Sequence, residues 1–262
     1  MAVRSIWTTQ CQTPPNAGEI NELNQGFEKS SAEEILTWAT TVFAPRITFS
    51  TALGIEGCVL VDMIARGNLA IDIFTVDTGL FFPETYALWE KLEKQYKLKI
   101  GAARSNVSLE RQAELHGPRL YDRAPNQCCQ LRKILPLEKE LKGFDAWITS
   151  LRRSQSRTRA HSPILAYDRR YEIYKLNPLA NWSEESVTDY IKSHGVPYNV
   201  LHERNYPSIG CQPCTTSVAP GEDSRAGRWR GEAKTECGIH FDETAGGFTR
   251  PQTLKGTKAG VK

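Results

Sequence analysis

The sequence predicts an α/β protein with a mainly parallel β-sheet, helices on both faces of that sheet, and a flexible C-terminal segment. Three observations lead to this prediction. Strand-like and helix-like segments alternate from residue 31 to residue 150, the order that βαβ units produce. The chain has 262 residues and 40% hydrophobic content, enough to bury a real core. From Val196 to the end, turn residues dominate.

Each element of the first half has a local signal. The first helix begins with a capping box, in which Ser31 and Glu34 bond the free amides of the first turn. Its apolar residues have helical spacing. A later helix has Pro83 in its first turn, where proline is tolerated. The predicted helices are 30–43, 58–66, 83–96 and 109–117, and the predicted strands are 45–50, 69–79 and 98–103.

The second half begins with a helix that Pro136 should bend near its start, because proline removes a helical hydrogen bond. A fourth strand follows, and after Ser150 the texture changes to a basic loop, a strand with an exit turn, and an N-capped helix that ends at a glycine. These elements are the helix 128–143, the strand 146–150, the loop 151–163, the strand 171–182 and the helix 183–195.

Composition narrows the class of protein. We expect a poorly ordered N-terminal tail (1–30), a nucleotide-binding body (31–220) and a mobile C-terminal segment (221–262). The net charge of +3, from 33 basic and 30 acidic residues, argues against a nucleic-acid or membrane-surface partner but allows a local anion site. No apolar run is long enough to span a membrane. The sequence therefore predicts a cytoplasmic protein.

Two cysteine pairs predict a metal or cluster site. In a reducing compartment, cysteines favour metal or redox chemistry over disulfides, and a disulfide between the adjacent Cys128 and Cys129 would be strained. Cys211 and Cys214 form a C-x-x-C pair in a Gly/Pro turn. Four thiolates suit either tetrahedral zinc or an iron–sulfur cluster. The adjacent pair favours a cubane, in which each sulfur can take a different iron.

Two other interpretations of these cysteines stay open. A thioredoxin-like redox role for Cys211 and Cys214 would leave the adjacent pair without a function. Unrelated buried thiols are the second alternative. Of the remaining cysteines, Cys58 lies on an apolar helix and is predicted to be a core residue, and Cys11 is predicted to be exposed.

Three segments place anion-binding groups where predicted strands end. Residues 48–56, "TFSTALGIE", carry hydroxyls and a glycine at a strand-to-helix turn, where free N–H groups attract phosphate. "VDTG" ends the second strand, and "RRSQSRTR" follows the fourth with four arginines. Carboxyl ends of parallel strands form one ligand-binding edge, and arginine suits phosphate or sulfate. Each segment alone has a simpler interpretation: the first is an ordinary βα turn, the second a turn capped by Asp77, and the third a solvated loop. Together, the three segments predict a nucleotide site.

Cys237 stands apart in "KTECGIH", after a flexible stretch. Lys234 and His240 lie close to it in the sequence, and an electropositive surrounding favours the reactive thiolate. Cys237 is therefore a candidate nucleophile, with a free surface cysteine as the simpler interpretation.

Six motifs in one order carry a resemblance to a known family: "VDTGLFFPETY", "CCQLRKILPL", "RRSQS", "LHERNYPSIGCQPCT", "GRWRG" and "KTECGIH". From about Ser31 to His240 the chain resembles the thioredoxin-dependent adenylyl-sulfate (APS) and phosphoadenylyl-sulfate (PAPS) reductases of assimilatory sulfate reduction. The resemblance implies an adenine nucleotide alpha hydrolase-like fold. It also implies reduction of APS to sulfite and AMP, thioredoxin or a glutaredoxin-like protein as electron donor, and a homo-oligomer.

The resemblance also implies roles for particular residues. A [4Fe–4S] cluster would be held by Cys128, Cys129, Cys211 and Cys214, and Cys237 would form an S-sulfonate intermediate. The segment that precedes Cys237 is expected to close over the substrate as a lid. The implied substrate contacts are Ser50, Thr51, Gly54, Asp77, Thr78, Gly79, Lys133, Arg159, Arg225, Arg228 and His240.

The chain departs from the family pattern in two places. Its loop "STALGIE" is neither the "SGAED" of many cluster-bearing members nor the "SSFGIQ" of cluster-free ones. The cluster implies APS as substrate, and PAPS activity remains the alternative. Asn205 replaces a glycine, a tolerable change because asparagine accepts a positive φ.

Two other function classes are weaker. An ATP-pyrophosphatase-type enzyme lacks its expected "SGGxDS" loop here. A non-catalytic zinc- or cluster-binding module would explain the four cysteines but leave Cys237 without a role.

Overall fold

The computed structural model describes residues 14–232, 234 and 236–239. Its centre is a six-stranded sheet in the order β3-β2-β1-β4-β6-β5, in which only the β5–β6 pair is antiparallel. The mainly parallel sheet that the sequence predicts is thus confirmed. The strands are β1 Ile47–Thr51, β2 Asp72–Asp77, β3 Ile100–Arg104, β4 Ala146–Ile148, β5 Leu165–Asp168 and β6 Ile173–Leu176.

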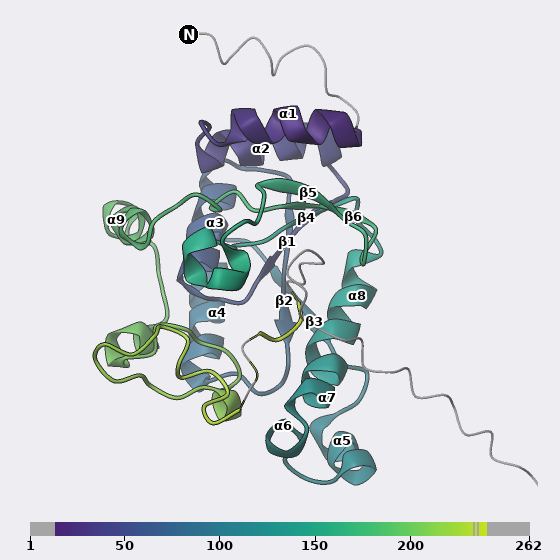
Figure 1. The fold of residues 1–262 in the computed structure, drawn as a ribbon, viewed down its shortest axis with the longest axis vertical. Coiled ribbons are helices and arrows are strands. Elements are labelled where there is room, and N and C mark those ends of the chain that lie inside the picture. Colours follow the sequence, from purple (N-terminus) through teal and green to yellow (C-terminus); the bar gives the residue numbers. More distant parts are fainter. Residues whose placement is uncertain (1–13, 233, 235, 240–262) are drawn as a thin grey trace, which may run out of the picture.

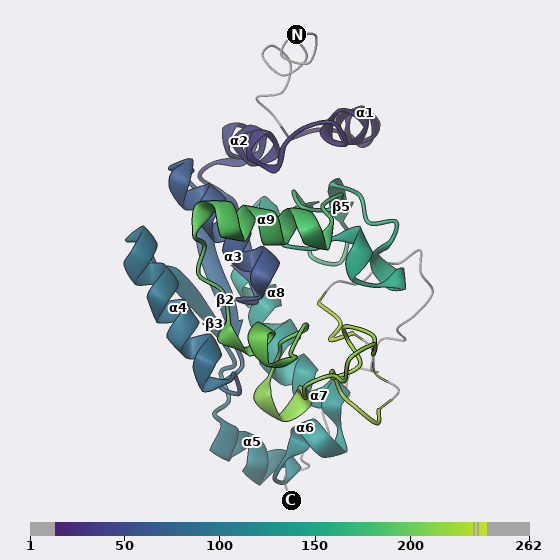
Figure 2. The same cartoon turned by 90° about the vertical axis from the view of Figure 1, so that its left-hand side faces the viewer.

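Helices cover both faces of the sheet (Figures 1 and 2). In both views α3, α4 and α9 lie on one side of the strands and α8 on the other. Loops of the C-terminal third and α5–α7 gather at the end of the molecule opposite α1 and α2. The helices are α1 Ala17–Phe27, α2 Ala32–Phe43, α3 Ile55–Arg66, α4 Pro83–Tyr96, α5 Leu109–His116, α6 Leu120–Arg123, α7 Pro125–Cys129, α8 Leu135–Leu141 and α9 Glu184–His194.

Successive side chains along each strand point to opposite faces of the sheet and so divide the core into two layers. On β2, Ile73 packs into the larger apolar cluster with α2, α3, α4 and α9, whereas Phe74 packs into a smaller cluster with α8. On β4, Ile148 and Trp147 divide in the same way. Because successive strand residues point to opposite faces, a strand covered on both faces needs apolar residues at every position. This is why these strands are apolar runs in the sequence.

The N-terminal helix α1 differs from the expectation of a poorly ordered segment over residues 1–30. Asn16 and Glu19 form a capping box at its start. Phe27 is buried and packs edge-to-face on Trp38, with ring centroids 5.0 Å apart. The Asn24 side chain donates to the carbonyl of Leu165 and accepts from its amide, both at 2.8 Å. These contacts fix α1 to the edge strand β5, so at least residues 17–27 belong to the folded body.

The predicted helix over residues 128–143 is interrupted as expected, but by a π-helix rather than a simple bend. Residues Gln130–Ile134 form this π-helix (η1) between α7 and α8. Pro136 has no N–H, so the carbonyl of Arg132 lacks its usual helical donor. The wider π turn, in which the amide of Leu135 donates to the carbonyl of Gln130, lies directly before it. Such turns are frequent at functional sites.

Other local predictions can be checked in the same structure. Asn205 has φ of 63° at the end of a 3₁₀ helix, which confirms that it takes the position of the expected glycine. Cys58 is fully buried on α3, as predicted, while Cys11 lies outside the described residues. The edge strand β5 was not foreseen. Among the described helices, none combines the length and apolar character needed to cross a bilayer.

Candidate functional site

The turn that follows β1 lies at the carboxyl edge of the sheet. Ser50 accepts a hydrogen bond from the indole Nε1 of Trp147 at 2.6 Å, and Thr51 is buried and accepts from the amide of Leu53 at 3.0 Å. Gly54 is the N-cap of α3 and supplies no side-chain cap. A Cβ at Gly54 would meet no described atom closer than 3.9 Å. The glycine therefore leaves open space in front of free helix amides, as an anion site requires.

Asp77, at the end of β2, is a buried residue bonded to three donors. Its Oδ1 accepts from the Gly79 amide and the Tyr86 hydroxyl, each at 2.9 Å, and its Oδ2 accepts from Arg104 Nε at 2.8 Å. Burial opposes its ionisation, but these three bonds more than compensate and lower the pKa of Asp77. The geometry makes Asp77 the cap of a tight turn, and its contact with a nucleotide stays a prediction.

Thr78 and Gly79 join the strand edge to the cysteine site. The Thr78 hydroxyl lies 3.3 Å from Cys211 Sγ, and the Thr78 carbonyl accepts from Nε of the buried Arg132. Gly79 has φ of 70°, in the left-handed region that favours glycine. Arg132 also donates to the carbonyl of Val107 at 3.1 Å. Arg132, which belongs to η1, thus bonds the turn that follows β2. The sequence motifs did not indicate this role.

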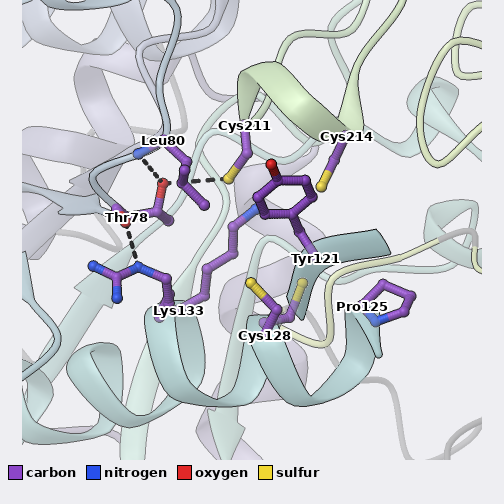
Figure 3. Close-up of a pocket in the computed structure, with 10 residues that line it drawn as sticks. Thr78, Leu80, Tyr121, Pro125, Cys128, Lys133, Cys211 and Cys214 are labelled. Atoms are coloured by element: carbon purple, nitrogen blue, oxygen red, sulfur yellow. Dashed lines mark hydrogen bonds between the residues drawn. The ribbon is translucent and has the colours of Figure 1, made fainter. Parts of the chain in front are cut away.

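The four predicted cluster cysteines line one pocket (Figure 3). Cys128 and Cys129 end α7. Cys211 is the N-cap of the 3₁₀ helix η5, Gln212–Cys214, and Cys214 is its last residue. The η5 loop is anchored to the turn after β2 because the Gln212 amide donates to the carbonyl of Leu80 at 2.7 Å. Two segments that are distant in the chain are thereby brought together, as the sequence predicts.

Burial controls the protonation of these thiols. It raises the pKa of Cys128 to about 12 and that of Cys214 to about 11, and neighbouring thiols add to the increase. The pKa of Cys129 is also raised by burial, while the charge of Lys133 opposes the increase. The free thiols of Cys128, Cys129 and Cys214 are therefore protonated at neutral pH. A bound metal centre would have to displace their protons, since thiolates are the ligating form.

Among the described residues, no group of three or more His, Cys, Asp or Glu side chains is arranged to hold a single metal ion. The four sulfurs nevertheless line the same pocket. Four thiol groups around one pocket are the donor set of both tetrahedral zinc and an iron–sulfur cluster.

Lys133 is the cationic residue of this pocket. It is half-buried, and its side chain extends from η1 across the pocket toward the loop that carries Cys211 (Figure 3). Burial acts to lower the pKa of Lys133, but the nearby thiols of Cys211, Cys237 and Cys129 act in the opposite direction and the net pKa is raised. Lys133 is therefore a positive charge that interacts with both cysteine pairs and with the candidate nucleophile.

The segment that carries Cys237 contacts elements around this pocket. The Trp229 amide donates to the carbonyl of Cys214 at 3.0 Å, and the Gly238 carbonyl accepts from Arg170 at 2.9 Å. Ile239 packs against the smaller apolar cluster of the sheet. Cys237 itself is half-buried. The structure thus brings together two features that the sequence left separate, the four-cysteine site and the candidate nucleophile.

Two arginines that are predicted to bind the substrate contact the same acidic residue, Glu236, which is not among the predicted site residues. Arg159, from the "RRSQSRTR" loop, and Arg225 both bond the carboxylate of Glu236. Arg228 instead donates to Ser208 at 3.3 Å and lies over the ring of Trp229. No local pattern marks Glu236, because its partners are distant in the sequence.

The remaining predicted residues lie elsewhere. The first two arginines of the loop are used structurally, Arg152 in a buried ion pair with Glu56 and Arg153 with Glu28. His240 lies outside the described residues. The roles predicted for the site residues stay predictions, and the structure supplies their positions.

The comparison with protein families decides the relationship. Residues 46–217 match the phosphoadenosine phosphosulfate reductase domain, which is most of the chain. The chain belongs to this family. The region spans the sheet and both cysteine pairs, so it contains the pocket but ends before Cys237. The family resemblance that the sequence motifs carry is thereby confirmed.

Individual relatives extend the match. The chain is 43% identical over 222 residues to an adenosine 5'-phosphosulfate reductase of Halalkalibacterium halodurans, covering 84% of this chain and 96% of that protein. It is 46% identical over 225 residues to one of Staphylococcus epidermidis, covering 86% and 93%.

Solved structures agree with the fold. The phosphoadenylyl-sulfate reductase of Candida auris has a TM-score of 0.70 at 31% identity, covering 78% of this chain and 98% of that one. An FMN adenylyltransferase of Candida glabrata, with a TM-score of 0.53 at 13% identity over 82% of this chain and 71% of that one, shares the fold alone. The prediction of an α/β fold of the nucleotide-binding type is confirmed.

Proposed function

We propose that this protein reduces APS to sulfite and AMP in assimilatory sulfate reduction toward cysteine, with thioredoxin or a glutaredoxin-like dithiol protein as electron donor. One observation carries the proposal: the half-buried Cys237 lies on the segment that bonds the Cys214 carbonyl of the four-cysteine pocket, directly after Glu236, the residue that Arg159 and Arg225 contact. A soft nucleophile next to fixed cations is what attack on an anionic sulfuryl group needs. The curated relatives described above, at 43% and 46% identity, are named adenosine 5'-phosphosulfate reductases.

The first half-reaction transfers a sulfonate group. The Cys237 thiolate attacks the sulfur of APS, an S–S bond forms, and the bond between sulfur and the phosphate oxygen breaks. AMP leaves with the electron pair of that bond. The thiolate and the phosphosulfate are both negatively charged, so cations must hold the oxygens before the two can approach. Lys133 and Arg225 are two described cations whose charges interact with Cys237.

The second half-reaction is a thiol exchange. A thiolate of the donor attacks Cys237 Sγ, sulfite leaves with the electron pair of the S–S bond, and a mixed disulfide forms. The second donor thiol then displaces Cys237 and regenerates its thiolate. The sulfuryl sulfur gains two electrons, and the donor dithiol becomes a disulfide. Because Cys237 is on the outer segment and half-buried, a modest displacement of that segment would expose it to a protein donor.

Nucleotide and sulfonate contacts divide between two regions. The free amides behind Gly54 and the hydroxyls of Ser50 and Thr51 are proposed to hold the adenylate at the carboxyl edge of the sheet. Arginines on the "RRSQSRTR" loop and the C-terminal segment are proposed to hold the phosphosulfate. The remaining proposed contacts are Asp77, Thr78, Gly79, Arg228 and His240.

A [4Fe–4S] cluster on Cys128, Cys129, Cys211 and Cys214 completes the proposal. The residues fit this group because four thiol side chains from two segments line one pocket, and thiolates are the usual ligands of iron–sulfur clusters. When bound, the cluster would fix the η5 loop against α7 and add its charge beside Lys133, while the two electrons come from the dithiol donor. Thr78, whose hydroxyl lies 3.3 Å from Cys211 Sγ, would hydrogen-bond a ligating sulfur.

PAPS reduction is the second candidate. The solved phosphoadenylyl-sulfate reductase of Candida auris, at 31% identity, favours it. The names of the bacterial relatives, at 43% and 46% identity, favour APS. The ratio of kcat/KM for APS and PAPS separates the two. We also propose a cytoplasmic location and a homo-oligomeric state, as the family resemblance implies.

The direct test is a single turnover without reductant. Protein purified anaerobically is mixed with APS, released AMP is quantified, and the intact protein and its peptides are examined by mass spectrometry. The proposal requires one sulfonate on Cys237 for each AMP released, and sulfite on addition of reduced thioredoxin. Unmodified Cys237, together with undiminished sulfite formation by a Cys237→Ser variant, would refute it. The visible absorption spectrum and analysis of iron and sulfide test the cluster independently.

A further inference from the structure

The carboxylate of Glu236 bridges the two arginines of the candidate anion site. Arg159 contacts it with two nitrogens, Nε to Oε1 at 3.1 Å and NH2 to Oε2 at 2.9 Å. Arg225 NH2 contacts the same Oε2 at 3.1 Å. Two parallel N–H···O bonds to one planar group are the geometry in which arginine also binds phosphate and sulfate. A dianionic ligand would make the same contacts in the same place.

The three side chains are largely shielded from water. Exposed fractions are 12% for the side chain of Arg159, 19% for that of Arg225 and 17% for that of Glu236. Burial lowers the pKa of Arg225, Glu236 opposes this, and the neighbouring Arg159 and Arg228 lower it further. Guanidinium groups this close and this shielded repel one another unless an anion lies between them. Glu236 supplies that anion when no ligand is bound.

The contact borders a groove wide enough for a ligand. The groove has a volume of about 380 Å³ and is lined by the C-terminal segment and by residues 156–158 of the arginine loop, within the range of about 300–1,000 Å³ usual for ligand sites. Arg225, Arg228 and Glu236 form part of its wall. An anion that enters the groove therefore meets Arg225 on the wall that also carries Glu236, and Arg159 is bonded to that same carboxylate.

We propose that Glu236 is an internal competitor for the anion site: its carboxylate holds Arg159 and Arg225 in the ligand-free protein and is displaced when the phosphosulfate of the substrate binds. Glu236 immediately precedes Cys237. Displacement of the carboxylate therefore frees the backbone next to the nucleophile at the moment the substrate is bound. Glu236 is a positioning residue in this scheme and touches no reacting atom. The inference rests on the proposed function in one respect: that function identifies the displacing anion as the phosphosulfate group of the substrate.

Binding of AMP and of inorganic sulfate, each followed by isothermal titration calorimetry at fixed ionic strength, tests the competition. A Glu236→Gln variant keeps the shape of the side chain but offers the arginines no charge. Since a charge-assisted contact corresponds to about a factor of ten in affinity, the Kd of the variant for at least one of these ligands should fall about tenfold. Glu140→Gln is the matched control: Glu140 is exposed on α8 and does not line the groove, so the affinities of this variant should be unchanged.

A second measurement follows the coupling to Cys237. The rate of Cys237 alkylation by iodoacetamide is measured by mass spectrometry with and without AMP or sulfate. In the wild type the ligand should change this rate, and in Glu236→Gln the ligand-free rate should already equal the ligand-bound wild-type rate. Hydrogen exchange of the wild-type protein provides a test without any variant, because residues next to Glu236 should exchange faster when the ligand is bound.

Several results would overturn the inference. Affinity that is unchanged or weaker in Glu236→Gln would mean that the carboxylate organises the arginines rather than competing with the ligand. Slower exchange near Glu236 on ligand binding would mean the same. Tighter sulfate binding in an inactive protein would preserve the inference and refute the proposed function. If the protein reduces APS but Glu236→Gln binds anions with unchanged affinity, the proposed function stands and the inference is refuted.

Discussion

Replacing Asp77 should distinguish a turn-stabilising carboxylate from a substrate ligand. In Asp77→Ala, three donors lose their acceptor: the Gly79 amide, the Tyr86 hydroxyl and Arg104 Nε. Arg104 is 65% exposed, Gly79 is exposed and Tyr86 is half-buried, so water can replace part of each lost bond. At about 1 kcal/mol for each of the three bonds, we expect the free energy of unfolding to fall by about 3 kcal/mol.

The conservative variant Asp77→Asn makes the reasoning sharper. Both the Gly79 amide and the Tyr86 hydroxyl bond the same oxygen, Oδ1, which asparagine retains. Only the exposed Arg104 contact is lost, so Asp77→Asn should cost about 1 kcal/mol, the value typical of an exposed ion pair. Asp72→Asn, at the exposed start of the same strand, is the control and should be neutral.

Urea unfolding followed by circular dichroism measures these differences as shifts in the midpoint at constant slope. The pH dependence has a defined sign. The pKa of Asp77 is lowered in the folded state from its ordinary value of 3.8, so its stabilisation is complete above that value and is lost as pH falls through the folded-state pKa. Asp77→Ala should lack this acid-dependent part. Equal stability of wild type and Asp77→Ala, with weakened AMP binding in the variant, would refute a structural role and make Asp77 a ligand.

Three further substitutions address the pocket and the loop. Lys133→Met should lower kcat/KM for APS by about 10²- to 10³-fold, the usual effect of removing one electrostatic contact to the transition state. The visible spectrum of the cluster should be unchanged. Full activity would contradict the role of Lys133. Cys129→Ser should abolish iron binding, seen by metal analysis, together with sulfite formation; full activity after loss of iron would show that the cluster has no role. Arg152→Met leaves Glu56 without its partner in an ion pair whose side chains are 8% and 13% exposed. The free energy of unfolding, measured in urea, should fall by about 3 kcal/mol. The double variant Arg152→Met with Glu56→Leu should recover part of this loss.

Local signals in the sequence were enough for most of the fold. Apolar runs, capping boxes and Pro83 identify elements because each depends on residues a few positions apart. The parallel arrangement follows from the alternation of strands and helices, and the joint placement of strand-end motifs follows from the parallel arrangement. The α1 capping box, Asn16 with Glu19, is also visible in the sequence. Its docking is not, because Asn24 contacts Leu165, 141 residues away.

The sequence by itself determined the chemistry that this protein has available: four thiols in two pairs, a separate cysteine with basic neighbours, and arginines after a strand. Residue type sets these properties wherever the chain places them. Only the tertiary structure decided which groups are free. Asp77 is bonded by three donors, and Arg159 is bonded by Glu236, 77 residues away. Such partners depend on how distant segments converge, and a carboxylate or guanidinium that is bonded within the protein must exchange that partner before it can bind a ligand.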